Sequence, residues 1–97
     1  MEEILFFETS SEQVYAHTRN DAFRVRYRLY ELEDILTRSF VRVSKGTIVN
    51  ISHIYAISRD LTTGGQIQFN TTHKRVHVSR HYYKVLKGRM SERGVQK

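Results

Sequence analysis

Cysteine and proline are both absent from the 97 residues of the chain. Without cysteine there is no disulfide, no thiolate nucleophile and no zinc site built on thiolates. This absence suits a reducing compartment, so we expect a cytoplasmic protein. No apolar run approaches the roughly 18 residues of a membrane span, and the N-terminus does not read as a signal peptide, so we expect no membrane partner.

Motifs for catalysis and cofactor binding are also lacking. The sequence contains no glycine-rich phosphate loop, no HExxH pair and no nucleophile elbow. His73, His77 and His81 recur at intervals of four. However, residues 75–78 have a strand pattern and a helix pattern begins at Ser79. His73 and His77 could share a strand face, but His81 would lie past the bend. We therefore expect no metal, no cofactor and no enzymatic activity.

The charge of the chain is unevenly distributed. The net charge is +6, with 16 Lys and Arg against 10 Asp and Glu. Residues 1–34 carry a net charge of −4, and residues 35–97 carry +10. A basic region of this kind is an electrostatic signature for a polyanion such as nucleic acid. Solubility, an acidic protein or an anionic lipid surface would explain the same charge.

The hydrophobic pattern predicts mainly strands. At 39% hydrophobic residues the chain can form one modest core. Helical spacing occurs at residues 30–38 and again from Ser79, where Tyr82, Val85, Leu86 and Met90 form the expected buried stripe. We expect small antiparallel sheets with one or two short helices, in one domain over 1–90 with a polar tail over 91–97. The expected strands cover residues 4–7, 14–18, 23–28, 40–43, 47–49, 54–58, 66–69 and 75–78.

A hairpin is expected around Asn20 and Asp21, followed by a strand with strict alternation. Its apolar face would hold Phe23, Val25 and Tyr27, and the opposite face would hold Arg24, Arg26 and Arg28. The arginines could follow a phosphate backbone or simply face solvent at a sheet edge, and we favour the solvated face. At the end of the first helix, Arg38 would pair with Asp34.

Two segments are candidates for anion binding. Ser79 can cap the last helix, and the cations of Arg80 and His81 follow it at a helix end that usually favours acids. Cations there make sense if a phosphate binds, although Arg80 could also point into solvent. The loop Ser44–Gly46 lies between two apolar strands and would project Lys45, or would be an ordinary turn.

Residues 40–54, FVRVSKGTIVNISHI, resemble the signature of LytTR-type DNA-binding domains, F-x-R-x-H-(R/K/N)-S-x-x-V-N-x-x-x-I. The segments ILFFE at 4–8, LYELE at 29–33 and VSRHY at 78–82 resemble other parts of that family in the same order. The similarity spans about residues 3–88. It implies an elongated, mainly β domain that serves as the output part of a response regulator in bacterial two-component systems.

The resemblance also implies how DNA would be bound. Such domains insert loops into successive major grooves of duplex DNA, often at direct repeats, and a homodimer could form on the DNA. Asn50 would hold its turn together. Carried over by position, the base contacts would be Glu12 in the 10–13 region, Lys45, Arg80 and His81. The expected phosphate contacts are Arg42, Ser44, Lys74, Ser79 and Lys84.

Four positions depart from the family pattern. Ser44 stands where His is usual, and Gly46 where Ser is usual. Glu12 replaces a basic residue or His, and would either repel phosphate or accept from a cytosine amino group. His81 stands where a second Arg is common, so bidentate readout of guanine would be lost there. We therefore expect a sequence preference of its own.

Two other functions remain open at this point. A β-rich RNA-binding module would use Tyr15, Phe23 or Tyr27 to stack on bases. A basic protein-interaction or membrane-surface module would use the positive face without nucleic acid. The sequence contains no receiver or sensor segment, so we expect either an excised domain or a stand-alone regulator.

Overall fold

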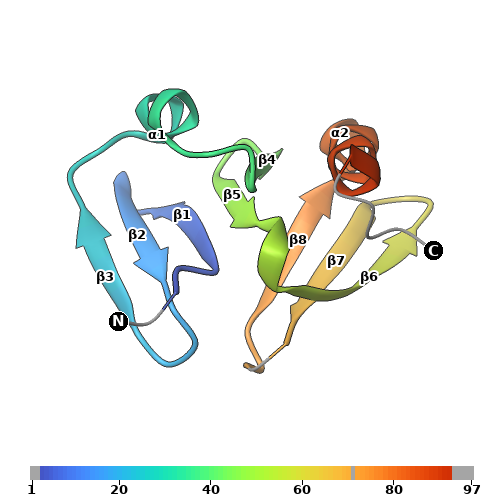
Figure 1. The fold of residues 1–97 in the computed structure, drawn as a ribbon, viewed down its shortest axis with the longest axis horizontal. Coiled ribbons are helices and arrows are strands. Elements are labelled where there is room, and N and C mark those ends of the chain that lie inside the picture. The colour runs from blue at the N-terminus through green and yellow to red at the C-terminus, as the bar shows by residue number, and fades with distance from the viewer. Residues whose placement is uncertain (1–2, 71, 93–97) are drawn as a thin grey trace.

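The computed structural model describes residues 3–70 and 72–92, which form two antiparallel sheets and two α-helices (Figure 1). This confirms the predicted mainly β fold with short helices. The elements in chain order are β1 (Phe6–Ser10), β2 (Gln13–His17), β3 (Ala22–Val25), α1 (Leu29–Ile35), β4 (Phe40–Ser44), β5 (Thr47–Asn50), the 3-10 turn η1 (Ile51–His53), β6 (Ile54–Asp60), β7 (Gly64–Phe69), β8 (Arg75–Ser79) and α2 (Arg80–Glu92).

The two sheets lie side by side and pack against each other. Sheet A has the strand order β3-β2-β1-β5-β4, and sheet B has the order β6-β7-β8. Strand β4, at one edge of sheet A, packs against both β8 and α2. The described part of the chain measures 35 × 26 × 24 Å.

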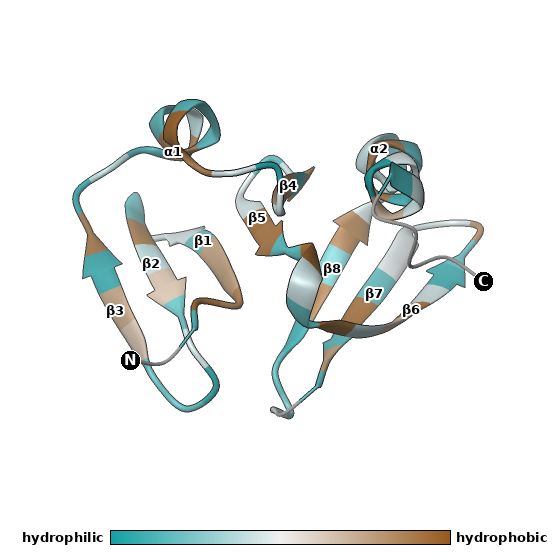
Figure 2. Cartoon of the chain, in the orientation of Figure 1, coloured by the Kyte–Doolittle hydropathy of each residue, from teal (hydrophilic) through white to brown (hydrophobic). Residues whose placement is uncertain are grey.

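The apolar run at residues 5–7 is buried because sheet A is covered on both faces. Phe7 points to one face, where Leu29 and Leu32 of α1 cover it. Phe6 points to the other face and joins the core between the sheets. Figure 2 shows hydrophobic stretches on β7 and β8, which supply the opposite side of this core. Val76 and Val78 of β8 both point inward, as their alternation predicts.

Asn50 has the predicted structural role. It is buried, its Oδ1 accepts from Ser52 N at 3.0 Å and its Nδ2 donates to Ile4 O at 3.1 Å. The first bond caps η1, and the second ties this turn to the segment that precedes β1. One side chain thus connects two parts of the chain that are far apart in sequence.

The predicted apolar face of residues 23–27 is wrong. Strand β3 ends at Val25, and Phe23 and Tyr27 are 49% and 51% exposed. The reason is that β3 is an edge strand, and α1 packs near β1 and β4 instead of over it. Of the three predicted apolar residues, Val25 alone packs against the core.

The last helix is rotated about its axis relative to the prediction, so the buried stripe differs in part from the one expected. Leu86 is buried and Met90 packs against the core, but Val85 is 49% exposed and Tyr83 takes its place. Helical spacing alone allows either stripe. Here β8 continues directly into α2, and the Tyr83 ring lies over Gly65 of β7, where no side chain occupies the space.

The predicted ends of both helices also differ from the structure. Helix α1 stops at Ile35 rather than residue 38, so Arg38 pairs with Glu92 of α2 and not with Asp34. Helix α2 extends through Glu92. The predicted polar tail over 91–97 therefore starts inside this helix, and residues 93–97 lie outside the described part of the chain.

Candidate nucleic-acid interface

Two of the candidate loops lie at the same end of sheet A. The turn between β1 and β2 consists of Ser11 and Glu12, and the loop between β4 and β5 contains Lys45. The backbone N–H of Thr9, near the end of β1, donates to Gly46 O at 2.8 Å. The two loops are therefore neighbours, although more than 30 residues separate them in the sequence.

The turn between β1 and β2 has a left-handed backbone. Ser11 and Glu12 have φ values of 52° and 66°, and Ser10 pairs with Gln13 across the hairpin. A two-residue loop with positive φ at both positions matches the twist of the strands it joins. Glu12 is exposed at the tip of this turn. The turn lies next to the Lys45 loop, and Glu12 also lines a pocket on the β3 side of the hairpin.

Arg42 braces the loop that carries Lys45. Its Nε donates to Ser44 O at 2.9 Å, a terminal N–H donates to Lys45 O, and its other terminal nitrogen lies 2.8 Å from a carboxylate oxygen of Glu33 on α1. Gly46 N donates to Ser44 Oγ at 3.3 Å. These bonds hold the loop backbone in place.

The Lys45 side chain itself is exposed. Within residues 3–70 and 72–92 its amine makes no hydrogen bond and no ion pair. Because the loop below it is braced, Lys45 presents a charged donor from a fixed backbone. This arrangement is suited to contact with an acceptor outside the chain.

The relation of β4 to α2 brings Lys45 and Arg80 to the same side. Arg89, near the end of α2, donates to Arg38 O at 2.8 Å, just before β4 begins. Strand β4 packs against both α2 and β8. Figure 1 shows the loop between β4 and β5 and the junction of β8 with α2 toward the same end of the two sheets, so the Lys45 loop and Arg80 lie on the same side of the molecule.

Arg80 and His81 begin α2 and are both exposed. Ser79 is the last residue of β8 and is half-buried. Lys84 is exposed and lies one helical turn after Arg80, on the same face of α2. Arg80 and His81 border a shallow pocket of about 310 Å³, whose other lining residues are Arg59, Asp60, Leu61, Gly64 and Tyr83.

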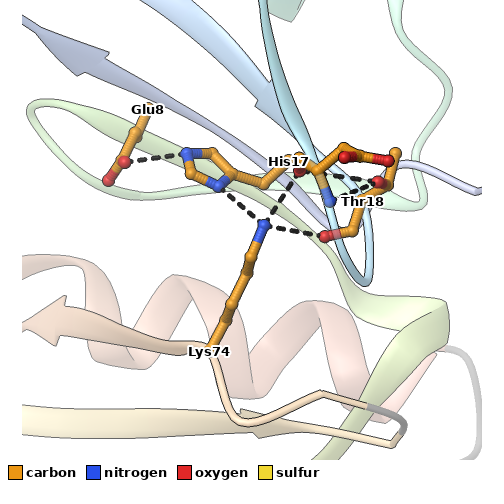
Figure 3. A network of polar contacts seen from close by, with 5 residues as sticks. Glu8, His17, Thr18 and Lys74 are labelled. Carbon is orange, nitrogen blue, oxygen red and sulfur yellow. Dashed lines mark hydrogen bonds and ion pairs between the residues drawn. The ribbon is translucent and has the colours of Figure 1, made fainter.

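Lys74 has a different environment from the other predicted contacts (Figure 3). Its Nζ donates to His17 Nδ1 at 3.2 Å and to the carbonyl oxygens of Thr18 and Asp21 at 2.9 Å each. An ammonium has three N–H donors. All three are therefore used within the protein, and they join the segment before β8 to the end of β2 and to the loop that follows it.

His17 is the central residue of this junction. Its Nε2 lies 2.8 Å from Glu8 Oε2, and its ring stacks on Phe6 with centroids 4.3 Å apart. Because Lys74 can only donate, Nδ1 must be the acceptor and the Nε2–H must donate to Glu8. Burial lowers the pKa of His17 below its usual value of 6.5, with a further lowering from the Lys74 charge and an opposing effect from Glu8.

The three arginines of the predicted stripe lie near the Glu12 turn and are exposed. Arg24 approaches Gln13 Oε1 at 3.4 Å. A shallow pocket of about 370 Å³ is bordered by Glu12, Gln13, Val14, Arg24, Val25, Arg26, Tyr27 and Arg28. The basic surface therefore continues from the loops toward the β3 edge.

The bracing role of Arg42 and the junction role of Lys74 were not anticipated from the sequence. For Arg42, the alternation in residues 40–44 offered a weak signal, because a side chain on this strand can reach the carbonyls of the following loop. For Lys74, no local signal exists, since its three acceptors lie 53 to 57 residues away.

Within residues 3–70 and 72–92, no three His, Asp or Glu side chains gather so that they could hold a metal ion. In the same part of the chain, neither helix has the length and apolar character needed to cross a membrane.

Comparison with known proteins gives a consistent result. A family model described as LytTr DNA-binding domain matches residues 1–91. Two relatives from Staphylococcus aureus, strains bovine RF122 / ET3-1 and NCTC 8325 / PS 47, are 34% and 33% identical over 89 residues. Both are described as uncharacterized HTH-type transcriptional regulators. The alignments cover 92% of this chain and 60% of each relative, so the chain spans less than two thirds of their length.

A solved structure has the same fold. It is a LytTr DNA-binding domain from Bacillus cereus, whose parent protein is described as a methyl-accepting/DNA response regulator. The TM-score is 0.80 at 25% sequence identity, covering 90% of this chain and 80% of the other. In the described residues of this chain, α1 and α2 are separated by five strands, so they do not form a helix-turn-helix.

Proposed function

The chain belongs to the LytTr DNA-binding domain family, and on this premise we propose that it binds duplex DNA sequence-specifically through loops, as the output domain of a bacterial transcriptional regulator in the cytoplasm. DNA binding in transcription regulation follows from the family. The use of loops, the specificity and the residue roles are our proposal. A receiver or sensor domain elsewhere in a longer protein would control this output.

The observation that carries the proposal is the gathering of free cations at one end of the molecule. The Lys45 loop lies beside the Glu12 turn, and Arg80 begins α2 on the same side. Lys45, Arg80 and Lys84 are exposed and make no ion pair within residues 3–70 and 72–92. A projecting loop of this kind can enter a major groove while the surrounding cations contact phosphates.

Each residue of this surface has a distinct proposed role. Lys45 and Arg80 donate to base edges, and guanine O6 and N7 are the acceptors that best suit them. His81 contacts a neighbouring base, and Glu12 accepts from a cytosine amino group. Lys84 and the hydroxyls of Ser44 and Ser79 contact phosphates.

Arg42 and Lys74 receive supporting roles in this proposal. Arg42 already donates to two carbonyls of the loop and faces Glu33, so it fixes Lys45. Lys74 has no donor left for phosphate. Both cations therefore shape the interface and do not form it.

Selection of duplexes from a random DNA library at about 0.15 M salt tests the proposal. We expect the bound duplexes to share a sequence motif, repeated in the same orientation at a spacing of one turn of the DNA helix. The domains would bind these repeats side by side or as a homodimer. Retention without any motif would reduce the function to nonspecific polyanion binding. If no duplex is retained at all, the proposal is contradicted.

A second candidate function rests on Phe23 and Tyr27. Both rings are about half exposed, and Tyr27 lines a pocket with Arg24, Arg26 and Arg28. Exposed rings close to cations are suited to stacking single-stranded bases. Competition between duplex and single-stranded DNA or RNA separates the two candidates. Preference for the single strand, lost in Phe23→Ala, would favour this second function over duplex recognition.

A further inference from the structure

Arg59 lies next to the proposed DNA-binding residues but comes from a different part of the chain. It is on β6 opposite Gly65 of β7, which in turn pairs with Val78 of β8. These three paired residues lie at the end of sheet B where β8 continues into α2. Arg59 and Arg80 consequently line the same shallow pocket.

The Arg59 guanidinium is held over an aromatic ring. Its Cζ lies 4.8 Å from the ring centroid of Tyr83 on α2. A guanidinium over an aromatic face is stabilised by cation–π attraction. Its N–H groups radiate from the edge of the plane, so stacking on the ring leaves donors available for an acceptor.

Two glycines allow the hairpin of β6 and β7 to approach α2 this closely. A Cβ at Gly65 would lie 2.6 Å from Ser58 O and 3.0 Å from the Tyr83 ring. Gly64 has a φ of +115°, and a Cβ there would lie 2.1 Å from Val78 O. Any larger residue would displace the hairpin. The position of Arg59 is therefore a consequence of tight packing rather than of a mobile loop.

The charge around Arg59 is positive and not neutralised. Asp60 is the one carboxylate among the residues lining the pocket, and its Oδ1 accepts from Thr62 N at 2.8 Å and from Thr63 N at 3.3 Å. This carboxylate thus holds the hairpin turn. Within residues 3–70 and 72–92, neither Arg59 nor Arg80 forms an ion pair.

We propose that Arg59, stacked on Tyr83, is a further DNA contact that binds a backbone phosphate beside the base read by Arg80. The inference rests on the proposed function. Arginine matches phosphate with two parallel N–H donors, and a guanidinium held by a ring loses little freedom on binding. The hairpin of β6 and β7 thereby becomes an additional element of the interface.

The test compares Arg59→Gln with Arg75→Gln in the full 97-residue chain. Arg75 is also exposed and belongs to sheet B, but it begins β8, three residues and about 10 Å along the strand from Val78. Both variants lose one charge. Affinity for the selected duplex is measured at several salt concentrations.

Arg59→Gln should reduce the magnitude of the salt slope by about 0.9, the value for one phosphate contact. The ratio of wild-type to variant affinity should therefore shrink about threefold between 50 and 200 mM salt. Arg75→Gln should leave the slope unchanged. Thermal unfolding shows whether each variant keeps the fold. If Arg59→Gln does not, Arg59→Met replaces it, because its side chain still covers the Tyr83 ring.

An unchanged slope in Arg59→Gln, or an equal reduction in both variants, would overturn the assignment while leaving duplex binding intact. Failure of the wild-type chain to bind duplex DNA would instead overturn the proposed function. Tyr83→Leu supplies an independent check. It removes the ring without changing the charge, so it should weaken binding, whereas Tyr83→Phe should bind like the wild type.

Discussion

The two ends of β8 carry cations in opposite surroundings. Before its start, the Lys74 amine donates to three acceptors, which lie at the end of β2 and in the loop that follows it. Past its end, Arg80 is exposed and makes no ion pair within residues 3–70 and 72–92. Figure 1 shows β8 connecting these two places, with α2 beginning where the strand ends. A cation's role in this molecule thus depends on the acceptors that the fold places around it.

Lys45 shows the same contrast with Lys74. A phosphate contact from Lys74 would have to break three internal hydrogen bonds, whereas the exposed Lys45 amine exchanges only water for its new partner. Net binding energy remains only where the lost interactions are weaker than the new ones. We therefore distinguish a structural end of the molecule from the proposed binding end, and four measurements can separate them.

The largest effect is expected for Lys74→Ala. Removing the ammonium leaves His17 Nδ1 and the carbonyls of Thr18 and Asp21 without their donor, so the free energy of unfolding should fall by about 2–3 kcal/mol. Urea denaturation measures this change. Lys87→Ala on the exposed surface of α2 serves as control and should stay within about 0.5 kcal/mol of the wild type. Unchanged stability together with lost DNA binding would place Lys74 in the interface instead.

Lys45→Ala should have the converse effect. We expect a loss of about 1–3 kcal/mol in binding the preferred duplex, little change on random duplex, and an unchanged urea midpoint. Titration of both duplexes with the same protein preparation provides the comparison. Equal losses on both would mean that Lys45 contacts phosphate and does not read a base.

Stability should also depend on pH through His17. The unfolded chain takes up the proton near pH 6.5, but burial and the Lys74 charge hold the pKa of the folded form lower. The contribution of His17 is therefore complete above pH 6.5 and decreases as pH falls through the folded pKa. The change should be smaller than in Lys74→Ala, because the Thr18 and Asp21 bonds survive protonation.

Urea denaturation at pH 7.5 and at pH 5.5 measures this dependence. His17→Gln should flatten it, since the replacement does not titrate. Two results would show that His17 does not cause the pH dependence of stability. One is a wild-type protein that becomes more stable on acidification, and the other is a His17→Gln variant with the same pH profile as the wild type.

Lys84→Ala should produce the smallest change. It should weaken binding to all duplexes alike by a few fold, with a salt slope smaller in magnitude by about 0.9. Affinity measured from 50 to 200 mM salt tests this prediction. An unchanged slope would remove Lys84 from the phosphate contacts.

Local sequence patterns were sufficient for much of the fold. The inward alternation of Val76 and Val78 and the turn held by Asn50 are confirmed. The helix beginning after Ser79 and the exposed position of Lys45 in its loop also agree with the structure. These features depend on backbone periodicity and on neighbours within a few residues.

Only the tertiary structure decided which faces are covered and which cations are free. Phe23 and Tyr27 are exposed because no element covers the β3 edge, and Val85 is exposed because Gly65 admits the Tyr83 ring. Lys74 is enclosed by acceptors 53 to 57 residues away. The sequence by itself determined the elements and their charged loops, because period and turn chemistry are local. The surroundings of each side chain depend on long-range packing, which no local pattern encodes.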